Sequence, residues 1–144
     1  MTLKILNGFL AVLFLLFAAL QYNDPDPGVW MLVYGAMSIV CAFAAFNMFS
    51  RPVMIVMASA YLIFSALHVD GMLEWLKSPN RNRIFDDVAK MQYPYIEEAR
   101  EFLGLLICLI VLMYLFYLQR YTKSAAVKEG VRHEGLPRRH EVTK

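Results

Sequence analysis

The stretch FLAVLFLLFAALQYNDPDPGVW, residues 9–30, joins a long apolar run to a short polar segment and then to a second apolar run. The polar part, NDPDP at 23–27, holds two acids and two prolines in five positions. Asp26 suits the capping position of a following helix, Pro27 suits its first turn, and Asp24 with Pro25 suits the preceding bend. The stretch therefore predicts two apolar helices joined by a tight polar turn.

Four apolar segments of this kind recur along the 144 residues, of which 59% are hydrophobic. In typical soluble proteins, about 45–50% of the residues are apolar. A helix needs about 20 apolar residues to cross roughly 30 Å of hydrocarbon. The third segment is marginal because its strictly apolar part, 53–67, is short, so a span there must include His68 and the residues after it. We predict an all-α membrane protein, a four-helix transmembrane bundle with helices at about 3–22, 28–49, 52–75 and 96–118.

The remaining segments are polar. The connection 77–95 begins with KSPNRNR and continues with IFDDVAKM, whose apolar residues favour a short amphipathic helix on the membrane surface. Residues 119–144 are basic and lack apolar periodicity, which predicts a flexible tail attracted to anionic lipid. Nucleic-acid binding is not expected, because no nucleic-acid-binding fold accompanies these charges. Residues 1–118 then form one transmembrane domain in the lipid bilayer.

The charges predict an orientation. Basic residues gather at both chain ends and at the turn 47–52, whereas acidic residues predominate in the connections on the opposite face. By the positive-inside rule, both termini are predicted to be cytoplasmic. The compact chain, without an organelle signal, is expected in the cytoplasmic membrane of a bacterium, with its acidic face outside.

Each predicted helix places one polar side chain at a similar depth, about 17 residues or roughly 25 Å from its inner, cytoplasmic boundary. An ionisable group in a membrane usually faces a partner or water. Glu101 is especially informative because it lies beyond the first helical turn, where the helix dipole no longer explains an acid. With the polar residues just above this layer, the candidate polar site comprises Gln21, Asn23, Asp24, Asp26, Tyr34, His68, Glu97, Glu98, Arg100 and Glu101.

His68 needs a polar partner on an apolar helix, and either Glu101 or Asp24 would satisfy it. Carboxylate oxygens with one imidazole are also suitable ligands for a divalent cation. No metal-binding spacing such as HExxH is present. A cation site stays open as an alternative, with candidate ligands Asp24, His68, Glu97 and Glu101.

Two motifs carry a family resemblance. They are Q-x-N-D-P-D at 21–26, followed by Trp30 and Tyr34, and E-E-x-R-E-x-x-G-L at 97–105. In this order they resemble the transmembrane protein 220 family of small multi-helix membrane proteins, over roughly residues 5–118. The resemblance implies an architecture and no established activity. The motif positions it carries over are Asn23, Asp24, Pro25, Asp26, Trp30, Tyr34, Glu97, Glu98, Arg100, Glu101 and Gly104.

The polar layer occurs without a recognisable nucleophile or cofactor motif. This favours a binding or accessory module in which NDPD and EEARE meet on the outer face and recognise a cation, a lipid headgroup or a membrane partner protein. The alternative is a small membrane enzyme that uses His68, Asp24 or Glu101 for acid–base chemistry, with or without a metal. A transporter subunit is a third hypothesis, disfavoured because the inner part of each helix lacks acidic and basic side chains.

Overall fold

A computed structural model describes residues 2–24, 26–85 and 92–134, and within these residues it contains no strand. Three helices are long and apolar enough to cross a membrane, and a bent pair of helices gives a fourth candidate span. The prediction of an all-α membrane bundle is therefore confirmed. The elements are α1 (Thr2–Leu20), the short 3₁₀ helix η1 (Gln21–Asn23), α2 (Pro27–Ala45), α3 (Arg51–Leu67), α4 (Val69–Lys77), the 3₁₀ helix η2 (Arg81–Arg83) and α6 (Pro94–Glu134).

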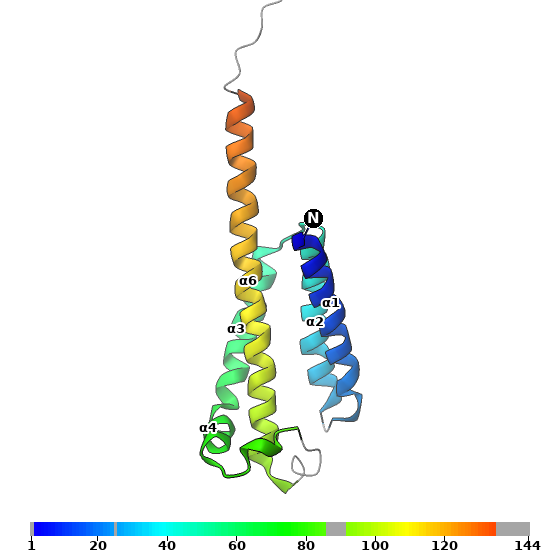
Figure 1. Ribbon diagram of the computed structural model, residues 1–144, viewed down its shortest axis with the longest axis vertical. Coiled ribbons are helices and arrows are strands. Elements are labelled where there is room, and N and C mark those ends of the chain that lie inside the picture. Colours follow the sequence, from blue (N-terminus) through cyan, green and yellow to red (C-terminus); the bar gives the residue numbers. More distant parts are fainter. Residues whose placement is uncertain (1, 25, 86–91, 135–144) are drawn as a thin grey trace, which may run out of the picture.

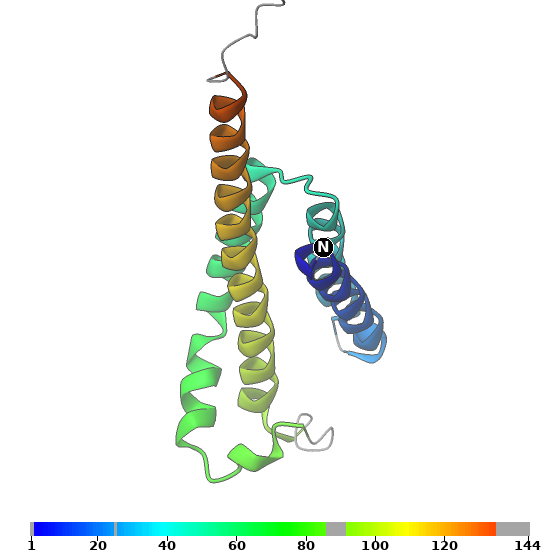
Figure 2. The same ribbon diagram turned by 45° about the horizontal axis from the view of Figure 1, so that its top comes forward.

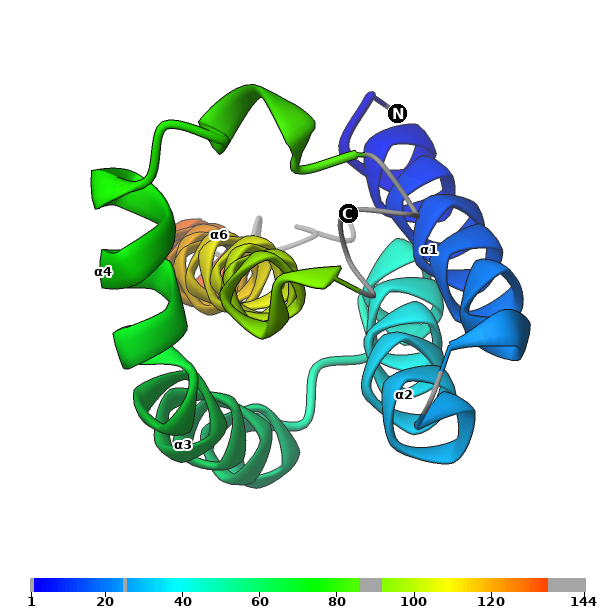
Figure 3. The same cartoon turned by 90° about the horizontal axis from the view of Figure 1, so that it is seen from below.

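The helices form two pairs when α3 and α4 are counted as one bent helix. Helices α1 and α2 pack against each other, and α3 and α4 pack against α6, so the pairs are distinct when the bundle is seen from below (Figure 3). The connection between α2 and α3 crosses from one pair to the other at the end where the chain begins (Figure 2). The start of α1 and the carboxyl half of α6 lie at this same end (Figure 1).

The two ends of the bundle differ in charge, and we name them by it. Lys4, Arg51 and Arg120 lie at the basic end, which holds the chain start and the α2–α3 connection. The opposite, acidic end holds every Asp and Glu whose side chain the structure describes. These residues are Asp24, Asp26, Asp70, Glu74, Glu97, Glu98 and Glu101.

Small residues and single hydrogen bonds join the helices. In the first pair, Ser38 Oγ donates to the carbonyl oxygen of Ala11 at 2.8 Å. Between the pairs, the Tyr61 hydroxyl of α3 donates to the carbonyl oxygen of Val33 in α2, also at 2.8 Å. Lipid offers helices no hydrophobic driving force to associate, so close packing and such bonds hold the bundle together.

The helix predicted over 52–75 is divided at His68. Helix α3 ends at Leu67, α4 begins at Val69, and the two are bent by 49°. The His68 N–H donates to the Ser65 carbonyl at 3.1 Å, which tightens the last turn of α3. The chain departs from the straight helix axis at this turn. At the bend α4 turns across the acidic end, where it packs against α6 (Figure 3).

Helix α2 stops at Ala45, short of the predicted end at 49. Asn47 has φ 60°, its N–H bonds to the Ala44 carbonyl at 3.0 Å, and the Met48 N–H bonds to the Phe43 carbonyl at 2.9 Å. This pattern is a Schellman motif, in which Asn takes the left-handed position that glycine usually occupies. The motif ends α2 and turns the chain towards α3.

Helix α6 is longer than the predicted span at 96–118. It runs for 41 residues to Glu134, about 60 Å at 1.5 Å per residue, and its last turns stand clear of the bundle (Figure 1). The flexible tail expected over 119–144 is thus helical as far as Glu134, because no proline lies between Pro94 and Pro137 and good helix formers predominate at 119–129. Residues 135–144, and most of the expected amphipathic helix at 84–91, lie outside the described residues.

Candidate functional site

A pocket of about 440 Å³ lies at the acidic end, where α1, η1 and α2 face the first turns of α6. Its walls combine charged groups, aromatic rings and apolar side chains. The lining residues are Phe17, Leu20, Gln21, Asp24, Trp30, Tyr34, Ile84, Phe85, Arg100, Glu101, Leu103, Gly104 and Ile107. We refer to it as the acidic-end pocket.

Glu101 is the most constrained residue of this pocket. Its Oε1 accepts a hydrogen bond of 2.9 Å from Nε1 of Trp30, in α2. Its Oε2 lies 3.1 Å from Nδ1 of His68, at the bend between α3 and α4. The side chains of His68 and Glu101 are 17% and 18% exposed. One carboxylate therefore joins three helices and is held in place by two donors.

Aromatic rings surround this carboxylate. Trp30 stacks on Phe64 with centroids 5.5 Å apart, and Phe64 meets the His68 ring edge-on at 5.0 Å. On the other side, Tyr34 lies 5.8 Å from Phe17. The rings leave little freedom for the side chains between them, so the polar groups of the pocket are positioned by packing.

Two glycines permit close approach of side chains to helix backbone. The Tyr34 hydroxyl lies against Gly104 of α6, where a β-carbon would collide with it. Glu98 of α6 lies over Gly71 of α4 in the same way. Gly104 belongs to the EEARE motif region, whereas Gly71 gave no sequence signal.

The comparison with known families decides the relationship that the motifs suggest. Residues 13–117 match the family described as "Transmembrane family 220, helix". The chain belongs to transmembrane family 220. No solved structure matches it.

In this family 220 protein, the acidic-end pocket brings the two motifs together. Gln21 and Asp24 come from the first motif, Tyr34 from the turns that follow it, and Arg100 and Glu101 from the second. The other candidate residues lie elsewhere. Asn23 and Asp26 are exposed, and Glu98 lies between α4 and α6. Glu97 is half-buried in the first turn of α6.

Asp26 occupies the capping position of α2, and Pro27 begins the helix, as the sequence predicted. Within the described residues, however, the Asp26 side chain makes no capping hydrogen bond. Its main-chain carbonyl instead accepts from the Trp30 N–H at 3.5 Å. The cap is therefore a backbone feature, and the carboxylate of Asp26 faces solvent.

The proposed metal ligands do not assemble into one cluster. Among residues 2–24, 26–85 and 92–134, no group of three or more His, Cys, Asp or Glu side chains is placed to hold a metal ion. His68 pairs with Glu101, one of the two partners expected for it.

Sequence reasoning missed the roles of three family 220 residues. Trp30 was noted only as a motif position, yet its indole N–H binds Glu101, 71 residues away in the sequence. Phe17 and Phe64 carried no signal beyond apolarity, since any large residue at a buried helix position has the same pattern. Only the motif spacing of Trp30 could have identified it.

Proposed function

We propose that this protein is a membrane-embedded binding module whose acidic-end pocket holds the headgroup of a zwitterionic lipid. One observation carries the proposal: the same pocket is lined by the charged side chains of Asp24 and Arg100 and by apolar side chains, some of them exposed on the surface of the bundle. A lipid at the membrane surface presents this combination of charges and apolar chains in one molecule.

The apolar walls support sideways entry from the bilayer. Leu20 is 75% exposed and Ile107 is 47% exposed, so both extend the pocket lining onto the lipid-facing surface of the bundle. A lipid entering here keeps its chains among other chains and moves only its headgroup into the pocket. The cost of taking apolar chains into water therefore does not arise.

The ammonium part of the headgroup is assigned to Asp24 and the adjacent aromatic rings. Phe17 and Tyr34 both line the pocket, and their rings lie 5.8 Å apart. A cation over an aromatic face is attracted by the ring quadrupole, most strongly where water is excluded. A carboxylate beside these rings adds a direct charge attraction.

The phosphate part is assigned to Arg100. A guanidinium group has planar, forked donors that match phosphate oxygens. Glu101 has a different role: its two oxygens bind Trp30 and His68. It orients the wall of the pocket and is not assigned to the ligand.

Fluorescence of Trp30 provides a direct test, because this residue lines the pocket. The measurement uses Trp75→Phe protein in detergent, so that Trp30 is the single reporter. Short-chain phosphatidylcholine and phosphatidylglycerol with matched chains are titrated. We expect a saturable change with phosphatidylcholine and a much weaker one with phosphatidylglycerol.

Asp24 and Asp26 make a matched pair for this experiment, since they lie two residues apart and only Asp24 lines the pocket. Asp24→Asn should weaken phosphatidylcholine binding, and Asp26→Asn should leave it unchanged. Equal responses to both lipids would contradict the proposal, and so would equal effects of the two substitutions.

A small membrane enzyme is the second candidate, supported by the His68–Glu101 pair. A carboxylate on Nδ1 orients a histidine for base chemistry at Nε2. Here Nε2 is buried, has no hydrogen-bond partner among the described residues, and His68 does not line the acidic-end pocket. Rapid modification of His68 by diethyl pyrocarbonate in the folded protein, read by peptide mass spectrometry, would favour the enzyme. Protection of His68 would favour the binding module.

The proposed orientation places the basic end in the cytoplasm of a bacterium. The support is the set of basic residues there, including Lys4, Arg51 and Arg120. Cysteines introduced one at a time at Asn23 and Ser124, both exposed, report the two sides, since the native Cys41 and Cys108 are buried. A membrane-impermeant maleimide applied to intact cells should label the cysteine at 23 and leave that at 124 unlabelled. The reverse pattern would overturn the orientation.

A further inference from the structure

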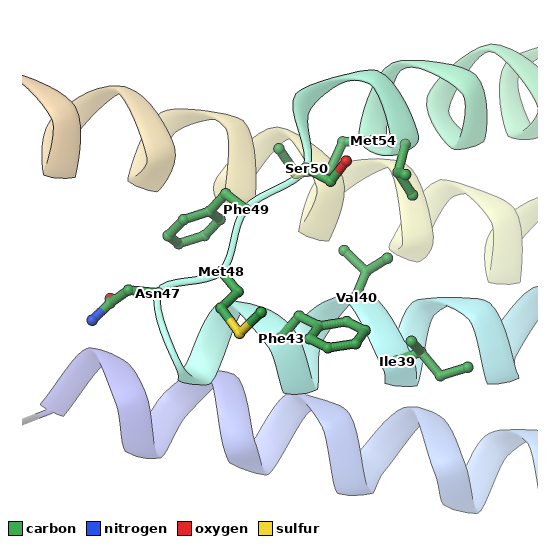
Figure 4. A pocket seen from close by; sticks show the side chains of 9 residues that line it. Ile39, Val40, Phe43, Asn47, Met48, Phe49, Ser50 and Met54 are labelled. Carbon is green, nitrogen blue, oxygen red and sulfur yellow. The ribbon is translucent and has the colours of Figure 1, made fainter.

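A second hollow lies at the basic end, between α2, the α2–α3 connection and the first turn of α3 (Figure 4). Its volume is about 590 Å³, within the range of roughly 300–1,000 Å³ typical of small-molecule sites. Apart from Asn47 and Ser50, its lining is apolar. The lining residues are Ile39, Val40, Phe43, Asn47, Met48, Phe49, Ser50, Val53 and Met54. We refer to it as the α2–α3 groove.

The groove follows from the way α2 ends. The Schellman motif at Asn47 folds Met48 back beside Phe43, the hydrophobic contact that commonly accompanies this motif (Figure 4). The connection then crosses to α3 through Phe49 and Ser50, which separates the two helices at this level (Figure 4). A hydrogen-bonded helix end thus builds one wall of the groove.

The groove opens onto the lipid-facing surface of the bundle. Among its lining residues, Ile39 is 58% exposed, Phe43 50% and Met48 60%. Apolar walls offer water few hydrogen-bond partners, and empty space would forfeit dispersion contacts. In a bilayer, the group at hand to fill such a groove is an acyl chain of the adjoining leaflet.

Charge at the mouth of the groove selects the headgroup. Arg51 begins α3 directly after Ser50, which lines the groove. On α6, Gln119 Nε2 donates to the Phe49 carbonyl at 3.5 Å, so Arg120 follows a residue that touches the connection. Every carboxylate whose side chain the structure describes lies at the opposite, acidic end. The charged side chains described near the mouth are therefore positive.

We propose that the α2–α3 groove binds one acyl chain of an anionic phospholipid, with the lipid phosphate beside Arg51. An acyl chain gains no hydrophobic free energy by leaving the other acyl chains of the bilayer for a protein groove. Headgroup charge must therefore decide which lipid occupies the site, so anionic lipid is preferred over zwitterionic lipid with identical chains. The site is separate from the acidic-end pocket and does not depend on the function proposed there.

Photo-crosslinking tests this assignment. The full-length protein is reconstituted in vesicles that contain phosphatidylglycerol or phosphatidylcholine carrying a diazirine in the acyl chain, at equal mole fraction. Peptide mass spectrometry then locates the label. We expect labelling concentrated at the groove, on Phe43, Met48 and Met54, and several times greater from phosphatidylglycerol. Label spread evenly over all lipid-exposed residues, or equal label from the two lipids at the groove, would overturn the proposal.

Two substitutions separate charge from shape. Arg51→Gln should reduce the preference for phosphatidylglycerol about fivefold, the effect of one basic side chain near an anionic surface. Its control is Lys77→Gln, at the acidic end, which should leave the preference unchanged. Val40→Trp should fill the groove and suppress labelling from both lipids. Its control is Leu62→Trp, which places the same residue on α3 outside the groove, where Leu62 is 64% exposed.

The design also distinguishes a protein occupant. If a second copy of the chain covers the groove, Phe43 and Met54 will be protected from the lipid label, which would refute lipid binding there. Should Val40→Trp fail to fold, the wild-type labelling pattern and Arg51→Gln still decide the outcome.

Discussion

The Nδ1 atom of His68 lies 3.1 Å from Oε2 of Glu101, at the point where α3 bends into α4. The other oxygen of Glu101 accepts from Trp30 of α2. In this layer of the membrane, polar side chains have few alternatives to bonding one another, because lipid supplies no donors or acceptors. The pair therefore joins the bend to the helix pair on the other side of the bundle.

Replacing Glu101 should destabilise the bundle in two steps. Glu101→Gln keeps an oxygen for Trp30 but loses the charge opposite His68, and should cost about 1.5–3 kcal/mol of unfolding free energy, typical of hydrogen bonds to charged groups. Glu101→Ala loses both contacts and should cost more. Unfolding in mixed detergent micelles measures these values. Glu97→Gln on the same helix is the control, and an equal cost there would show that the contacts of Glu101 are unimportant.

Substitution of the two contact glycines should also be costly. A β-carbon at Gly71 would collide with Glu98, and one at Gly104 would collide with the Tyr34 hydroxyl. Each change to alanine should destabilise the protein by about 1–3 kcal/mol, the usual cost of overpacking. At Gly35, nothing lies within 4 Å of the added carbon, so alanine there should be neutral or stabilising by up to about 1 kcal/mol. Thermal melting of the three variants makes the comparison, and similar effects at all three would refute it.

The left-handed conformation of Asn47, φ 60°, predicts a distinct ranking of substitutions at this position. Asn47→Gly should preserve or increase stability, whereas Asn47→Val should cost about 1–2 kcal/mol, because a β-branched residue is strained at positive φ. The midpoint of thermal denaturation in detergent ranks the variants. A valine variant as stable as the glycine variant would be inconsistent with the Schellman motif.

The hydroxyl of Tyr61 forms a hydrogen bond between α3 and α2. It donates to the Val33 carbonyl at 2.8 Å in a buried position. Tyr61→Phe should lower the unfolding free energy by about 0.5–1.5 kcal/mol, the net value of one hydrogen bond. Tyr117→Phe removes a hydroxyl from a 69% exposed residue and should have little effect. If both variants unfold alike, this bond does not hold the pairs together.

Several features of the fold were readable in the sequence because they depend on local composition. The apolar length of each segment predicted the spans, Pro27 predicted the start of α2, and the two charge clusters predicted a bundle with unlike ends. The polar side chains Gln21, Tyr34, His68 and Glu101 were expected at one depth. Gln21, Tyr34 and Glu101 line the acidic-end pocket, and His68 does not line it but pairs with Glu101. Depth follows from counting residues along a helix of constant rise.

Local composition did not predict where helices bend, stop or continue. Nothing in the apolar pattern of 53–67 distinguishes a straight helix from one divided at His68. The bend depends on a tertiary contact, in which α4 packs across α6 and buries Gly71 against Glu98. Likewise, Asn47 is an ordinary polar residue in the sequence, and its left-handed conformation depends on the path to α3.

Periodicity and length alone predicted the membrane setting and the helical class, and they gave an expected depth for each polar residue. Which neighbour each polar residue meets was decided by the tertiary structure. Glu101 had several possible partners at its level, and the rotation of α2 and the bend at His68 select Trp30 and His68 from among them. The α2–α3 groove arises in the same way, because a cavity depends on how two helices separate in space and leaves no periodic mark in either one.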